Sequence, residues 1–115
     1  MNPDGAPAIA KIKGTVDRMR SGRCKNESYY RKFIIQYSDS YRDNNGEVVF
    51  VNMFQAVVGF NEVARKIKAE IAEGDTVYII GRLKSRYVVN FETEVFIEIE
   101  EPEDIVKLPD MGELG

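Results

Sequence analysis

Three cations recur at every second position of one short stretch of the chain: Arg82, Lys84 and Arg86. Side chains two residues apart leave an extended strand on the same side, so these three form one basic row, and Tyr78 shares that side. Cations beside an exposed ring can hold phosphate groups and stack against flat bases. The alternative is that the row is only the solvated outer side of a strand.

A second cluster combines rings and cations in the segment Tyr29–Lys32. Because adjacent strand residues point to opposite faces, either its odd or its even positions can line a binding surface, but not both. We favour Tyr30 and Lys32 on the outside. Tyr41 and Arg42, in the linking segment that follows, add another ring and another cation.

Phe50 and Phe54 lie on one face of the next apolar segment, together with Asn52. The opposite face holds aliphatic side chains that suit a core: Val49, Val51, Met53 and Val57. This division frees the two phenyl rings for stacking, although core packing or a contact between subunits is an equally open interpretation.

Two charged runs have opposite signs. The basic run consists of Arg18, Arg20, Arg23 and Lys25. It either extends a phosphate-binding track or is a solvated loop. The acidic run consists of Glu92, Glu94, Glu98 and Glu100. A polyanion would be repelled by it, so we expect it to lie off the groove, where it guards an edge or competes with nucleic acid for the basic face.

The chain has one cysteine, Cys24, and no histidine. A zinc site, an internal disulfide and a Ser-His or Cys-His nucleophile all need residues that the chain lacks. Carboxylates at alternate positions of the acidic run could hold Mg²⁺, but no general base or nucleophile accompanies them. We therefore expect no enzymatic activity, no metal site and no cofactor.

A length of 115 residues suits a single domain. The net charge of −3 comes from two unlike parts, because residues 1–90 hold 15 Lys or Arg and 10 Asp or Glu, while residues 91–115 hold one Lys and 9 acidic residues. No apolar run could span a membrane and no signal-peptide pattern occurs. We expect a cytoplasmic protein, in the host cytoplasm if it is phage-encoded, with no membrane partner.

The hydrophobic period predicts the order of the elements. Alternation of apolar and polar residues predicts five strands, at 8–20, 29–38, 48–58, 77–86 and 91–100. Between the third and fourth strands, apolar residues recur at three- and four-residue intervals from Phe60 to Ile71, which predicts an amphipathic helix. We also expect a bend or bulge at Gly14, a projecting link at 39–47 and a loosely held tail after Pro102.

Three strands, a helix and two more strands is the order of an OB-fold. This fold is a five-stranded, partly open Greek-key barrel with an α-helix between strands 3 and 4. We assign it to residues 1–101 and a short acidic tail to residues 102–115. Another small β-barrel, or an α+β sheet with one helix on a face, would produce a similar pattern.

Two stretches resemble a known family. FQAVVGFNEVA at 54–64 and IAEGDTVYIIGRLKSR at 71–86, with TEV at 93–95, are similar to motifs of the single-stranded-DNA-binding (SSB) family. The resemblance covers residues 8–101 and implies an OB-fold that binds and protects single-stranded DNA in replication, recombination or repair, without sequence specificity. It also implies a homodimer or homotetramer, with replication or recombination proteins as further partners.

The chain also departs from that family. It has no Trp, so either Tyr and Phe stack the bases or the binding is weaker, and the link at 87–90 is shorter than the long hairpin of many members. The end of the acidic tail differs from the usual partner-recruiting one, so recruitment is left open, and a phage- or plasmid-type or divergent member fits. Two other functions suit the same residues: a protein-interaction subunit of a replication or primosome complex, and a single-stranded RNA chaperone.

Overall fold

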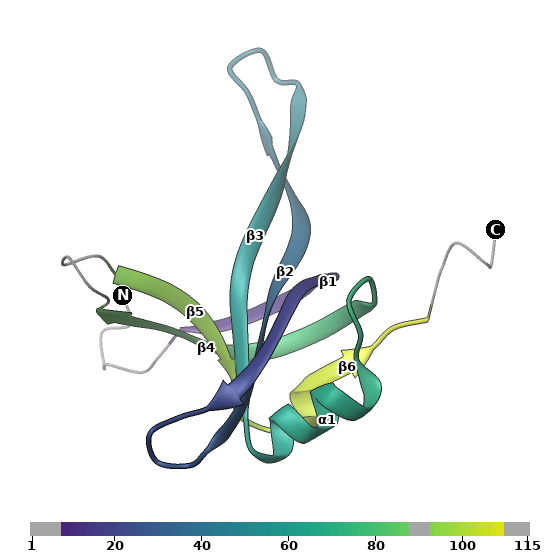
Figure 1. Cartoon of the computed structure of the whole chain (residues 1–115). Coiled ribbons are helices and arrows are strands. Elements are labelled where there is room, and N and C mark those ends of the chain that lie inside the picture. The colour runs from purple at the N-terminus through teal and green to yellow at the C-terminus, as the bar shows by residue number, and fades with distance from the viewer. Residues whose placement is uncertain (1–7, 88–92, 110–115) are drawn as a thin grey trace.

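The structure is a computed structural model that describes residues 8–87 and 93–109 (Figure 1). Its elements are β1 (Ile9–Arg23), β2 (Tyr29–Arg42), β3 (Val48–Phe60), α1 (Glu62–Glu70), β4 (Thr76–Tyr87), β5 (Thr93–Ile99), the 3₁₀ turn η2 (Pro102–Asp104) and β6 (Ile105–Lys107). The order of the first six elements is the one that the hydrophobic period predicts. The strands are mostly longer than predicted, and β6 was not predicted.

The strands close into a ring. Their hydrogen-bonded order is β1-β2-β3-β5-β4-β6, and β1 also pairs with β4. The first half of β1 lies against β4 and its second half against β2, while β3 and β5 run parallel. The result is the predicted five-stranded OB-fold, with α1 between β3 and β4 at one end of the barrel (Figure 1).

Apolar side chains on the inner sides of the strands fill the barrel. The fully buried ones include Phe33, Ile35, Val57, Ile79 and Ile97. Helix α1 adds Val63, Ala64 and Ile67 from its apolar face. Burial of each large side chain contributes about 1.5 to 3 kcal/mol, so the core strongly specifies which residues of each strand point inward.

Strand β1 is irregular beyond the glycine that suggested a bulge. The pairing register is continuous at Gly14 and shifts between Asp17 and Arg20, where Arg18 has a φ of 52°. Gly14 is small because it is closely packed: a Cβ atom there would lie 2.4 Å from the backbone oxygen of Gln36. The predicted bulge at Gly14 was therefore misplaced by a few residues.

Strands β2 and β3 extend past the barrel as a two-stranded arm (Figure 1). Their pairing continues to Arg42 opposite Val48, so Tyr41 and Arg42 lie in β2 and not in a link. Among the aliphatic residues predicted to form a core on β3, only Val57 is fully buried. The others lie on the arm, outside the ring: Val49, Val51 and Met53.

The segment that follows η2 packs against the barrel, which corrects the prediction of a loosely held tail from Pro102. Strand β6 pairs with β4, with Ile105 opposite Ile79. The Ile105 side chain is fully buried, and the backbone N–H of Leu108 donates to the carbonyl of Thr76. Residues 110–115, which include the end of the predicted acidic tail, lie outside the described residues.

Among the described residues, no helix has the length and apolar character needed to cross a bilayer.

Candidate nucleic-acid interface

The outer face of β2, β3, β5 and β4 carries most of the predicted rings and cations. The register places Lys32 opposite Val58, and Val58 in turn opposite Glu98 on β5. Arg82 on β4 follows in the same row. Because Phe33 is in the core, the even-numbered positions of the segment 29–32 point outward, as predicted.

Three depressions on this face share lining residues and form a continuous track. The first is a cavity of about 170 Å³ lined by Cys24, Tyr30, Lys32, Val58, Phe60, Arg86, Glu94 and Phe96. The second shares Tyr30, Lys32 and Arg86 with it and adds Arg18, Arg20, Phe33 and Ile34. The third continues from Arg18 and Ile34 to Asp17 and Phe54. The track thus brings together six of the predicted site residues: Arg18, Arg20, Tyr30, Lys32, Phe54 and Arg86.

A glycine makes room for the Tyr30 ring. Gly22 lies opposite Tyr30 in the β1–β2 ladder, and a Cβ atom on Gly22 would lie 2.8 Å from the Tyr30 hydroxyl. On the other side, the rings of Tyr30 and Phe60 are tilted by 57° with centroids 6.5 Å apart. Tyr30 is therefore held between a bare stretch of backbone and a second ring, which presents aromatic surface to the cavity.

Phe60 and Phe96 line the cavity although neither was predicted as a site residue. Phe60 was assigned to the apolar face of the helix, but it is the last residue of β3. Phe96 lies between Glu94 and Glu98 on the same side of β5, and the Arg86 guanidinium lies 6.0 Å from the centroid of its ring. A ring among carboxylates on the charged side of a strand was the signal that could have identified Phe96.

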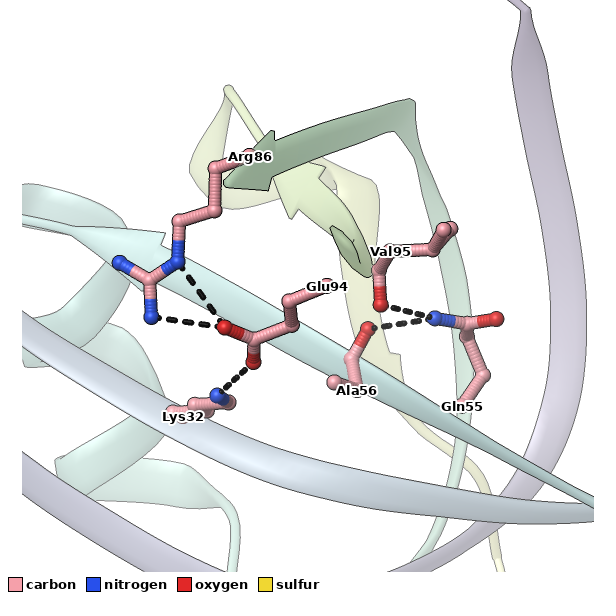
Figure 2. A network of polar contacts seen from close by, with 6 residues as sticks. All are labelled: Lys32, Gln55, Ala56, Arg86, Glu94 and Val95. Atoms are coloured by element: carbon pink, nitrogen blue, oxygen red, sulfur yellow. Dashed lines mark hydrogen bonds and ion pairs between the residues drawn. The ribbon is translucent and has the colours of Figure 1, made fainter. Parts of the chain in front are cut away.

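Glu94 links two of the cations across the cavity (Figure 2). One carboxylate oxygen accepts a hydrogen bond from Lys32. The other accepts one from Arg86 Nε at 2.9 Å and forms an ion pair with Arg86 Nη2 at 2.8 Å. These hydrogen bonds hold the pKa of the Glu94 carboxyl below its ordinary value. Figure 2 also shows Gln55, whose side-chain amide donates to the carbonyls of Ala56 and Val95 and so ties β3 to β5.

The acidic run lies among the cations, and the expectation that it is off the groove is wrong for Glu94, which lines the first depression, whereas Glu98 and Glu100 line none of the three. Besides Glu94, Glu98 accepts a hydrogen bond from Lys84 at 3.0 Å, and Glu100 pairs with Arg82. The cause is the sheet order, because β5 lies between β3 and β4 with its glutamates on the outer side. Glu92 lies outside the described residues.

Arg18 and Arg20 are the cations of the track that the β5 glutamates do not hold. The Arg18 side chain is 77% exposed and its Nε is 3.8 Å from the Asp17 carboxylate. Arg20 is exposed, lies opposite Lys32 in the pairing of β1 with β2, and has no ion-pair partner among residues 8–87 and 93–109. The irregular stretch of β1 therefore presents two guanidinium groups that the β5 glutamates do not hold, at the middle of the track, and one of them pairs with Asp17.

The other six predicted residues lie beyond the track. Arg82 and Lys84 continue the outer side of β4, and Tyr78 is on the same side further along, paired with Val106 of β6. Phe50 and Arg42 are on the same side of the arm as Phe54 by alternation, and Tyr41 is on its other side. Phe50 is 74% exposed.

The sequence profile described as the single-strand binding protein family matches residues 14–100. The chain belongs to this family. The match covers β1 from Gly14 onward, the other four barrel strands and the helix, so it includes the whole of the track. No curated protein sequence matched the chain.

Solved structures of single-strand binding proteins have the same fold as the chain. The Plasmodium falciparum SSB in complex with single-stranded DNA is 17% identical, covers 95% of this chain and 100% of its own, and superposes with a TM-score of 0.78. A mutant single-stranded DNA binding protein from Thermus aquaticus is 18% identical over 90% of this chain, with a TM-score of 0.75. This chain spans about half of that one, 51%. The small single-stranded DNA-binding protein from Streptomyces coelicolor is 22% identical, covers 82% of this chain and 89% of its own, and has a TM-score of 0.63.

This member of the single-strand binding protein family has no Trp, and apart from the buried Phe33 the rings along its track are those of Tyr30, Phe54, Phe60 and Phe96. Tyr and Phe also have a flat face on which a base can stack, although they are smaller than Trp. Within the described residues, no group of His, Cys, Asp and Glu side chains is arranged to hold a metal ion.

Proposed function

We propose that the chain binds single-stranded DNA along the track that runs from Phe96 to Phe54, without reading the base sequence. Single-strand binding is the activity of the family to which the chain belongs. The observation that carries the proposal for the track is its composition: three adjoining depressions, lined by the exposed ring of Phe54, by half-buried rings and by the cations Arg18, Arg20, Lys32 and Arg86.

The rings and the cations make different contacts with single-stranded DNA. Stacking on each ring contributes about 1 to 3 kcal/mol per base, and every base has a face to stack. The guanidinium and ammonium groups contact phosphates, which are identical at every nucleotide. Because both kinds of contact ignore base identity, the resulting binding is non-specific in sequence. Such binding needs no catalytic group, and we propose a binding protein rather than an enzyme.

We further propose that the protein coats and protects single-stranded DNA in replication, recombination or repair, and that it acts as a homodimer or homotetramer in the cytoplasm. The similarity to the Plasmodium falciparum protein, whose structure was solved with single-stranded DNA, supports the DNA part of this proposal. Sedimentation in the presence and absence of DNA would measure the subunit number. Replication or recombination proteins remain the expected further partners.

Titration with oligo-dT, followed by intrinsic tyrosine fluorescence, tests DNA binding. We expect tight binding at 50 mM NaCl that weakens on raising the salt to 200 mM, because each phosphate contact contributes about −0.7 to the slope of log K against log salt for a single strand. Equal affinity for duplex DNA would contradict the proposal. Weak binding at both salt concentrations would favour the protein-interaction subunit instead, and tighter binding of oligo-U than of oligo-dT would favour an RNA chaperone.

A further inference from the structure

Every outward cation at the end of β4 is paired with a glutamate of β5 or with Glu100, which follows it. Arg82 pairs with Glu100, Lys84 with Glu98 and Arg86 with Glu94. Lys32 from β2 shares Glu94 with Arg86. We call Glu94, Glu98 and Glu100 the glutamate ladder. It holds four cations of the outer face, of which Lys32 and Arg86 line the track proposed for DNA and Arg82 and Lys84 lie beyond it.

A carboxylate takes the same hydrogen-bond donors as a phosphate. Arg86 offers Nε and Nη2 to a single oxygen of Glu94, in the manner in which guanidinium groups also hold phosphate oxygens. The ladder therefore stands in the places that DNA phosphates would take beside these cations. Its four cations and three carboxylates leave a net charge of +1 on this part of the face.

The cations of the ladder reach water more than its carboxylates do, since the side chains of Glu94 and Glu98 are only 25% and 22% exposed. The Arg86 side chain is 63% exposed, and those of Arg82 and Lys84 are 41% and 39% exposed. Pairs between exposed side chains contribute little to the free energy of folding, because water competes for both partners and salt screens them. Their charge nevertheless acts directly on a polyanion that approaches the same face.

We propose that the glutamate ladder is an autoinhibitory contact, in which Glu94, Glu98 and Glu100 compete with DNA phosphates for Lys32, Arg82, Lys84 and Arg86. This inference rests on the proposed function. A single strand of DNA first contacts Arg18 and Arg20, which the glutamate ladder does not hold. It extends over β4 and β5 only by displacing the carboxylates from their cations. The ladder thereby weakens binding, reduces its salt dependence and speeds release.

The size of the effect follows from charge. Replacing one ladder glutamate by glutamine keeps the shape of the side chain and raises the net charge of the face by one. The slope of log K against log salt should steepen by roughly 0.7 per replacement, and by about 2 for all three together. A unit charge several ångströms from a phosphate in water corresponds to a change of roughly two- to fivefold in affinity.

The experiment compares four proteins by titration with oligo-dT between 50 and 200 mM NaCl: the unaltered chain, Glu98→Gln, the triple variant Glu94→Gln/Glu98→Gln/Glu100→Gln, and Glu70→Gln. Glu70 is an exposed residue of α1 outside the ladder, so its replacement changes the net charge of the protein equally but leaves the ladder intact. Thermal unfolding of each protein shows that it is folded, and Glu98→Gln tests the idea with only one ion pair removed.

We expect Glu98→Gln and the triple variant to bind more tightly than the unaltered chain, with steeper salt slopes, and Glu70→Gln to differ little from it. If only the triple variant binds DNA, the result would support the proposal and show that the glutamates block binding completely in the unaltered chain. If the unaltered chain binds DNA and the triple variant has the same affinity and salt slope, the proposed autoinhibition is overturned while the proposed function stands. The same holds if Glu70→Gln has as large an effect as Glu98→Gln. No binding by any of the four proteins would overturn both.

Discussion

Tyr30 shows how a single side chain depends on its neighbours for a role in binding. Its ring lies against the backbone of Gly22 on one side and near the ring of Phe60 on the other. Because Tyr30 also lines two of the three depressions, it is central to the track. A ring held in this way loses little conformational freedom when a base stacks on it.

We expect Tyr30→Leu to weaken binding of oligo-dT by about 1 to 3 kcal/mol, because leucine fills space but offers no face for stacking. The salt slope should stay unchanged, since no charge is removed. Tyr30→Phe is the matched control and should retain most of the affinity. Equal losses for both variants would indicate that the hydroxyl, and not the ring, makes the contact.

Glu94 also has a consequence for stability against pH. Its pKa in the folded chain lies below the ordinary value of 4.5, first because of the hydrogen bond from Lys32 and then because of the one from Arg86. A lowered folded-state pKa means that these bonds stabilise the fold above pH 4.5, and that the contribution is lost as the pH falls through the folded-state value.

We therefore expect Glu94→Gln to unfold at a slightly lower temperature than the unaltered chain at pH 7. The difference should be small, since Arg86 is largely exposed and water reaches part of Glu94, and it should vanish in acid once the carboxyl is protonated. Melting curves at a series of pH values would measure it. A difference that grows in acid would contradict this assignment.

At the scale of elements, β6 is the part of the fold that the sequence pattern did not reveal. Its three residues are too few for a period of two to be recognised, and Pro102 and the acidic residues before it are typical of a tail. The structure instead places Ile105 in the core, beside the strand that carries Arg82 and Lys84.

We expect Ile105→Ala to lower the free energy of unfolding by about 2 to 5 kcal/mol, because it leaves a cavity at a fully buried position. Val106→Ala, at the neighbouring residue, is the matched control. Its side chain is 45% exposed, so its loss should cost much less. Denaturant unfolding would compare the two, and similar small losses would mean that β6 is dispensable to the fold.

The arm formed by β2 and β3 illustrates how element length affects the interpretation of single residues. Alternation along β3 separated Phe50 and Phe54 from the aliphatic side chains, and the structure has that alternation. Yet the aliphatic residues of the arm have no core to enter, because the arm extends beyond the ring (Figure 1). Burial depends on what lies opposite a strand face, which a pattern along one strand does not contain.

At the scale of the whole molecule, charge is distributed differently in space than along the chain. The sequence separates a basic body from an acidic end. In the fold, β5 lies between β3 and β4, so its glutamates stand beside the cations of β4 and β2. The basic potential of the face is therefore concentrated around Arg18 and Arg20, where the described glutamates of β5 make no contact.

The sequence by itself determined the order of strands and helix and the grouping of cations and rings along the sides of single strands, while for β2 and β3 it left open which side faces outward. These properties are local, because alternation within one strand decides them. Only the tertiary structure decided that Phe60 and Phe96 join Tyr30 around one cavity, that β6 completes the sheet, and that the β5 glutamates meet the cations. Those outcomes depend on which strands become neighbours when the barrel closes, and that pairing joins residues far apart in the chain.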